Sequence, residues 1–202
     1  MTALHELAES WRQWSRDADK EEAGWQTDFP EWSRLLAAAQ RAMVGPFDET
    51  ALPDLELVWE ASEESEEMLE FSANERGTTD HWLPRLVLSS RPAVRWQVYE
   101  SLRQADKAQW AHTILRDGLR DADNYARRRA VIALEARGVE DIGELSLRLT
   151  SDPDPYVRRI AVAMAIKSKS PELLRTVLSQ LGDDPEELVR TAIAEASRLP
   201  AQ

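Results

Sequence analysis

Apolar residues in the C-terminal part of the chain recur with helical spacing, and the pattern itself repeats. A Val or Ala followed by Arg occurs four times, at Val94-Arg95, Ala126-Arg127, Val157-Arg158 and Val189-Arg190. The intervals between the Arg residues are 32, 31 and 32 residues. Within the third copy, apolar side chains continue from Val157 at i+3, i+4, i+7 and i+8, which is the stripe of an amphipathic helix. A second apolar stretch precedes each copy, so the period predicts stacked pairs of helices of about 12 residues each.

The segment that joins the two helices of each pair also repeats. Three of the predicted second helices are preceded by Pro, at Pro92, at Pro153 with Pro155, and at Pro185, where a missing N–H costs nothing. An Asp lies six positions before the Arg in three copies, and Ser89 takes that place in the first. The three pairs are Asp121 and Arg127, Asp152 and Arg158, and Asp184 and Arg190.

The stretch Ser151-Asp-Pro-Asp-Pro-Tyr-Val-Arg-Arg-Ile-Ala-Val-Ala-Met resembles the HEAT repeat, in particular the short bacterial type. The resemblance extends over roughly residues 79–200. It implies an all-α, right-handed α-solenoid of about four helix pairs. It also implies that the Asp and Arg residues pair within and between neighbouring repeats as a structural ladder. The ladder residues are Asp121, Arg127, Asp152, Arg158, Asp184 and Arg190, with Arg95 as the member whose partner differs.

The N-terminal 78 residues carry helical stripes without the repeated pair. One stripe begins at Leu4, a second runs from Trp32 to Met43, and a third begins near Pro53. We therefore divide the chain into an acidic, Trp-rich helical cap at 1–78 and HEAT-like repeats at 79–202. Six of the eight Trp residues precede position 85. They are expected either to form the core of the cap or, in one or two cases, to line a recognition surface.

Charge is divided unevenly along the chain. Residues 1–85 carry a net charge of −13 and the remainder carries +1, which gives the total of −12. Such a balance disfavours binding to nucleic acid. The chain has no Cys, no apolar run of 18 residues and no signal-peptide pattern at its start. A cytoplasmic protein without membrane contact is expected, and no motif indicates a metal or another cofactor.

Seven Glu residues lie between positions 56 and 70, and five of them are predicted to share one helical stripe. The seven are Glu56, Glu60, Glu63, Glu64, Glu66, Glu67 and Glu70. No Lys or Arg is available as an i+4 partner, so like charges repel along the stripe. The run is interpreted either as a solvated surface or as a docking site for a basic partner, the latter formed by all of these except Glu66. A calcium site would require an Asp- and Gly-containing loop pattern that is missing.

The outward side of the second helices forms another candidate surface. Residues at the second, sixth and ninth positions after the repeated Val or Ala are expected there, and HEAT-like solenoids commonly hold ligands on this side. The candidate partner-binding residues are Trp96, Glu100, Arg103, Arg128, Arg129 and Arg159, with Glu135, Glu195 and Arg198 beside them. The alternative is an ordinary solvated helix face.

Catalytic chemistry has little support in the sequence. His5, His81 and His112 fall on separate predicted helices, and no nucleophile elbow, phosphate loop or metal-ligand spacing occurs. We therefore expect a non-enzymatic protein–protein scaffold or adaptor of undetermined oligomeric state. One alternative is an immunity protein that neutralises a basic bacterial toxin. A more remote one is a HEAT-like DNA glycosylase, suggested by Trp96 beside Arg128 and Arg159 but disfavoured by the net charge.

Overall fold

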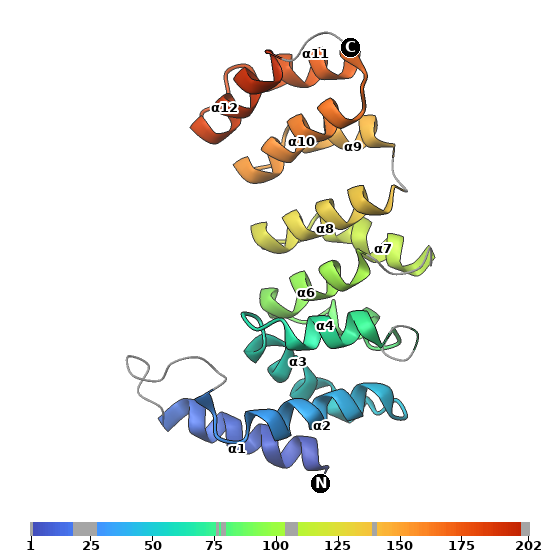
Figure 1. The fold of residues 1–202 in the computed structure, drawn as a ribbon, viewed down its shortest axis with the longest axis vertical. Coiled ribbons are helices and arrows are strands. Elements are labelled where there is room, and N and C mark those ends of the chain that lie inside the picture. Colours follow the sequence, from blue (N-terminus) through green and yellow to red (C-terminus); the bar gives the residue numbers. More distant parts are fainter. Residues whose placement is uncertain are drawn as a thin grey trace. The chain divides into compact units, whose positions relative to one another are not determined.

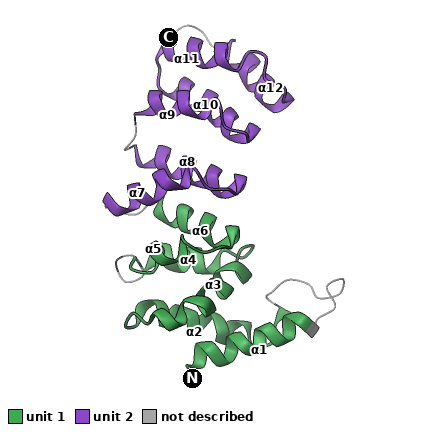
Figure 2. Cartoon of the chain, turned by 180° about the vertical axis from the view of Figure 1, so that it is seen from behind, with its two compact units in different colours: residues 1–108 green, residues 109–202 purple. Residues whose placement is uncertain are grey.

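The computed structural model describes residues 2–17, 28–75, 77, 80–103, 109–138 and 141–198. Every regular element in these ranges is helical, which confirms the all-α class (Figure 1). The chain forms two compact units, Met1–Ala108 and Gln109–Gln202 (Figure 2). The predicted boundary between cap and repeats, at 78/79, marks where the repeat pattern begins in the sequence and not where one compact unit ends. It stays a prediction.

In its described residues, the first unit contains the three helices predicted for the N-terminal part and four further elements. They are α1 (Ala3–Asp17), α2 (Trp32–Val44), the 3-10 turn η2 (Glu49–Ala51), α3 (Leu52–Ala61), α4 (Glu67–Asn74), α5 (Leu83–Leu86) and α6 (Pro92–Leu102). Trp59 and Trp82 are completely buried, and Trp32 and Trp96 are nearly so. These indoles therefore belong to the core of the unit. Trp82 is fixed further by donating its indole N–H to the Met43 carbonyl at 3.1 Å.

The acidic run does not form one continuous helix, contrary to the predicted stripe. Helix α3 ends at Ala61 and α4 begins at Glu67, so Glu63 and Glu64 lie in the connection. Glu66 adopts the left-handed conformation, with φ at 55°. No apolar residue between positions 62 and 67 anchors a longer helix, and adjacent carboxylates oppose one. The break lets Met68 on α4 enter the core.

The described part of the second unit consists of three helix pairs. These are α7 (Gln109–Gly118) with α8 (Asn124–Arg137), α9 (Ile142–Leu149) with α10 (Pro155–Lys167), and α11 (Pro171–Gln180) with α12 (Glu187–Ala196). Helices α8, α10 and α12 lie side by side in chain order, as Figures 1 and 2 show. Small buried residues, such as Ala130 on α8 and Ala161 on α10, allow these helices to approach closely. This stacking of pairs is an α-solenoid.

The first predicted pair departs from this arrangement. Its first helix, α5, has only four residues, and its second helix, α6, packs against α3 and α4 as well as α5. The repeat pattern is therefore intact around α6 but not in the helix before it. The outward side of α6, which would be open in a regular repeat, faces other helices of the first unit.

Candidate functional site

The repeated Arg makes the same main-chain contact in every copy. Its Nη1 donates to the carbonyl of the residue six positions earlier. The distances are 2.9 Å for Arg95 to Ser89, 2.6 Å for Arg127 to Asp121, 2.9 Å for Arg158 to Asp152 and 2.8 Å for Arg190 to Asp184. The six-residue spacing thus corresponds to a side chain that closes the turn before its own helix. It does not correspond to pairing with the carboxylate of that same Asp.

The side chain six positions before the Arg has a separate role in the turn. Its oxygen accepts the backbone N–H two residues later, at 2.9 Å in Asp121, 2.8 Å in Asp152, 3.0 Å in Asp184 and 3.2 Å in Ser89. Ser therefore replaces Asp as a turn former. A hydroxyl carries no negative charge, however, so the first copy cannot supply a carboxylate to a neighbouring Arg.

Two Arg–carboxylate pairs connect neighbouring repeats within the second unit. Arg127 donates to Asp152 through Nε at 3.1 Å and through Nη2 at 3.0 Å. Arg158 binds Asp184 in the same way, at 2.6 and 2.9 Å. The hydrogen bond from Arg158 holds the pKa of Asp184 below its usual value, and the same bond raises the pKa of Arg158. In each bidentate pair the Arg lies on a second helix and the Asp lies in the turn of the next repeat. The pairs therefore join α8 to the turn before α10, and α10 to the turn before α12.

A second Arg contact lies next to the ladder on the outward side of α8. Arg128 forms a bidentate ion pair with Asp154, whose side chain is 1% exposed. The Arg128 guanidinium also lies 4.0 Å from the centre of the Tyr156 ring. Asp154 additionally caps α10 by accepting the Tyr156 N–H. The predicted basic patch therefore loses one member, because the charge of Arg128 is balanced within the protein.

The two other Arg residues of that patch behave differently. Arg129 packs on the Tyr125 ring, 4.9 Å from its centre, and donates from Nε to the Tyr125 hydroxyl at 3.0 Å. The side chain of Arg159 is exposed and, among the described residues, has neither a hydrogen bond nor an ion pair. It borders a groove of about 280 Å³ between α10 and α12. The remaining lining residues are Val162, Ala163, Ile166, Ala192, Glu195 and Ala196.

Large apolar side chains also reach solvent on these second helices. Tyr125 is 40% exposed, Tyr156 is 48% exposed and Ile166 is 38% exposed. Tyr125 and Tyr156 each precede the repeated Ala or Val, so they occupy the same register in neighbouring repeats. Neither these tyrosines nor Asp154 were predicted from the sequence as site residues. Their periodic placement before the repeated pair was a signal that would have identified the two tyrosines.

The candidate residues from the first unit are placed differently from those of the second. Trp96 is only 4% exposed and donates its indole N–H to Glu63 at 2.8 Å, so the prediction that it lies on an open face is wrong. The reason is that α4 and the connection before it cover that side of α6. Arg103 is exposed and pairs with Glu100 at 3.0 Å. The glycosylase-like grouping of an exposed Trp96 with unpaired basic residues is therefore absent from the described part of the chain.

Several Glu residues of the acidic run form contacts inside the first unit. Glu60 pairs with Arg91, Glu63 accepts from Trp96, and Glu67 accepts from the Trp32 indole at 2.9 Å. The run thus joins α3 and α4 to α2 and α6. Glu56 is half-buried, whereas Glu64, Glu66 and Glu70 are exposed.

Gln97 is a residue of this region that the sequence did not reveal. It is completely buried and donates to the carbonyls of Trp59 at 2.7 Å and Ala93 at 2.9 Å. The first contact satisfies a carbonyl in the last turn of α3. Its position in the apolar stripe of the repeat gave no indication of a polar contact.

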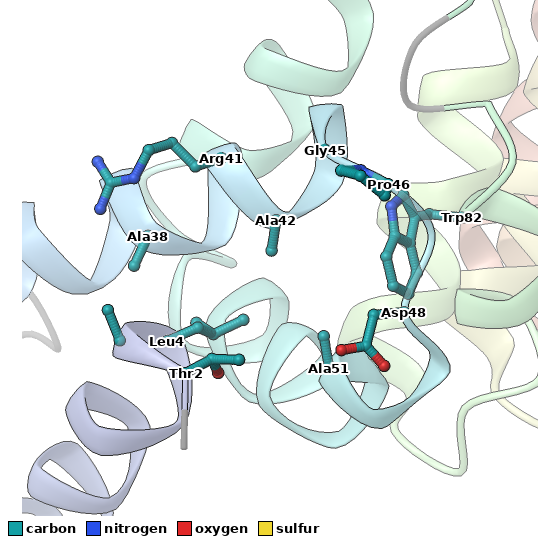
Figure 3. A pocket seen from close by; sticks show the side chains of 11 residues that line it. Thr2, Leu4, Ala38, Arg41, Ala42, Gly45, Pro46, Asp48, Ala51 and Trp82 are labelled. Carbon is teal, nitrogen blue, oxygen red and sulfur yellow. The ribbon is translucent and has the colours of Figure 1, made fainter.

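The first unit also contains a pocket of about 280 Å³ between the start of α1, the end of α2 and η2, with the Trp82 ring as one wall (Figure 3). Its charged lining side chains are Arg41 and Asp48, and Asp48 already accepts from the Thr50 N–H at 3.0 Å and from the Thr50 hydroxyl. The rest of the lining is mostly apolar. We find no paired catalytic groups at this pocket.

Another cluster of titratable side chains in the first unit forms structural contacts. The buried Asp54 accepts from Arg12 at 2.7 Å and lies 3.0 Å from His5 Nδ1, which ties α1 to α3. No group of three or more His, Asp or Glu side chains in the described ranges is arranged to hold a metal ion. Within the same ranges, no helix is both long and apolar enough to cross a bilayer.

Comparison with known proteins bears on the repeats. Neither the curated proteins nor the solved structures include a match to this chain. A family model described as HEAT repeats matches residues 112–198, which lie within the second unit. The matched range starts after the degenerate first pair. HEAT repeats commonly mediate contacts between proteins and are typically non-catalytic. Together with the stacked helix pairs and their Arg–Asp ladder, the match identifies residues 112–198 as HEAT repeats.

Proposed function

We propose that this protein is a non-enzymatic scaffold or adaptor that binds another protein through the exposed face of α8, α10 and α12. The observation that carries the proposal is the exposure of Tyr125, Tyr156 and Ile166 on adjacent second helices. Aromatic side chains with a polar tip are enriched in protein interfaces, because they bury a large area at a small cost in conformational entropy. Arg159 adds hydrogen-bond donors at the same face.

The test is a comparison of partner capture by the unaltered chain and by a Tyr125→Ala, Tyr156→Ala double variant. Both tyrosines are exposed, so the fold should survive, and circular dichroism would verify this. Loss of a captured partner from the double variant supports the proposal. Leu88→Ala is a matched control, because Leu88 is 77% exposed but lies in the first unit. Partner capture that is unchanged in the tyrosine variant and lost in the control would place the interface elsewhere.

An immunity function is the second candidate, supported by the charge of the first unit. Glu64, Glu66 and Glu70 are exposed and close in sequence, and residues 1–85 carry a net charge of −13. Such a surface favours fast association with a basic protein, as expected of an inhibitor of a basic toxin. Expression of the chain together with a basic toxin encoded beside it would test this function. Survival only when the chain is present supports immunity.

A further inference from the structure

Neighbouring repeats place an Arg at the same position of their second helix. The contacts of one such Arg therefore show which groups an Arg at this position binds. Arg128 lies two residues after the repeated Ala126 and is held by the next repeat, through the Asp154 carboxylate and the Tyr156 ring. The carboxylate comes from a nearly completely buried side chain, so solvent screens the pair only in part. An Arg at this register is thus satisfied by a carboxylate that lies beside an apolar surface.

The following repeat has an Arg at the same position, but the residues that would bind it differ. Arg159 occupies the same register on α10, while Glu186 and Leu188 take the places of Asp154 and Tyr156. Glu186 does not cap α12 with its side chain, and its charge acts on Arg158 instead. Arg159 therefore lacks the carboxylate that Arg128 has, within the ranges that the structure describes.

The surface beside Arg159 is hollow and mainly apolar. Ala163 on α10 and Ala192 on α12 are too small to fill the space between the helices, and Val162 contributes to the floor. Ile166 borders the groove and is 38% exposed. The charged lining residue on α12 is Glu195, which is exposed and, like Arg159, has no ion pair among the described residues.

We propose that the groove between α10 and α12 binds a partner segment that presents a carboxylate to Arg159 and an aliphatic side chain to the alanine floor. This inference rests on the proposed binding function and names the chemistry of the partner at one site. Charge complementarity sets the order of residues along the segment. Its carboxylate is attracted to Arg159, and Glu195 repels a second carboxylate. The residue on the other side of the aliphatic one is then neutral or basic.

Display of random 12-residue peptides, selected on the full-length chain, tests the proposal. We expect enrichment of an Asp or Glu next to Leu, Ile, Val or Met. Arg159→Glu should weaken binding of the enriched peptides by more than tenfold, and Ala163→Trp should do so by filling the groove. A peptide in which Lys replaces the acidic residue should regain affinity for the Arg159→Glu variant. Arg175→Glu, the same charge change at an exposed residue of α11, should leave affinity unchanged.

The outcomes separate this inference from the function on which it rests. Selection without an acidic–aliphatic motif, or equal affinity of the peptides for the unaltered chain and Arg159→Glu, overturns the groove proposal. If captured protein then still depends on Tyr125 and Tyr156, the scaffold function stands without the groove. If capture depends on none of these residues, both proposals fail. Recovery of binding by the charge-reversed peptide cannot arise from a merely structural role of Arg159.

Discussion

At the scale of single residues, a ladder Arg can contact main-chain carbonyls and the carboxylate of the next repeat. Within the described ranges, Arg158 makes both contacts and Arg190 makes only the first, so substitutions at the two positions separate their contributions to stability. Arg158 binds main-chain carbonyls and the Asp184 carboxylate, whereas Arg190, in the last repeat, binds only the carbonyls of Asp184 and Pro185 among the described residues. Arg158→Ala leaves a carboxylate that is 3% exposed without its main partner, so we expect a loss of about 2–4 kcal/mol in the free energy of unfolding.

Arg190→Ala is the matched control, because it removes the equivalent main-chain bonds alone. Its expected cost is about 1 kcal/mol. Urea unfolding of both variants measures the difference. Equal losses would mean that the bond between repeats contributes nothing beyond the turn.

The lowered pKa of Asp184 gives this pair a defined pH dependence. Because the Arg158 hydrogen bond depresses the pKa in the folded state, the stabilisation is fully present above the unfolded-state value of about 3.9. It is lost as the pH falls through the lower, folded-state pKa. The stability difference between the unaltered chain and Asp184→Asn should therefore be largest at neutral pH and shrink below about pH 4. Urea titrations from pH 7 to pH 3 measure this difference. A constant difference would mean that the pKa of Asp184 is not shifted, and a difference that grows at low pH would mean that it is raised.

At the scale of helices, the acidic run contains two sets of Glu that differ in their contacts. Glu60, Glu63 and Glu67 bind an Arg or an indole, whereas Glu64, Glu66 and Glu70 are exposed. Changing either set to Gln removes three negative charges. We expect the first triple variant to lose about 1–2 kcal/mol of unfolding free energy, because charge-assisted hydrogen bonds weaken. The exposed triple should change by less than about 0.5 kcal/mol. Thermal unfolding of the two triple variants measures the difference. Equal shifts in their melting temperatures would contradict a structural role for Glu60, Glu63 and Glu67.

The same region shows how far the helices could be predicted from the sequence. Apolar spacing located α1, α2 and α3, and the repeated pair located α6, α8, α10 and α12. The lack of apolar residues between positions 62 and 67 weakened the expected stripe, but spacing could not predict that α3 stops at Ala61, because where the helix ends also depends on Met68 reaching a core built by other helices. For the same reason Trp96 was expected on an open face. A periodic pattern gives the side of a helix but not which other element covers it.

The candidate site was predictable to a similar extent. The register pointed to Arg128, Arg129 and Arg159 as neighbours on the outward faces of two adjacent second helices. Their unequal availability depends on Asp154, which lies in the turn of the following repeat and is buried by folding. The sequence therefore indicated the surface, and only the tertiary contacts distinguished the paired Arg128 from the unpaired Arg159.

At the scale of the whole molecule, the two units carry different charge and different exposed chemistry. The first is strongly acidic, and the second presents tyrosines and a groove with one Arg and one Glu. Long-range attraction belongs to the acidic unit and acts on the association rate, whereas the groove acts on short-range contacts and the dissociation rate. A single partner that uses both would show the two effects separately.

Binding kinetics of a captured basic partner provide that measurement. Glu64, Glu66 and Glu70 changed to Gln should slow association at low salt and have little effect once the Debye length falls well below about 10 Å. Arg159→Glu should instead speed dissociation at both salt concentrations. If the three Gln substitutions change neither the association rate nor its salt dependence, the exposed carboxylates are only a solvated surface, and recognition is confined to the second helices of the HEAT repeats.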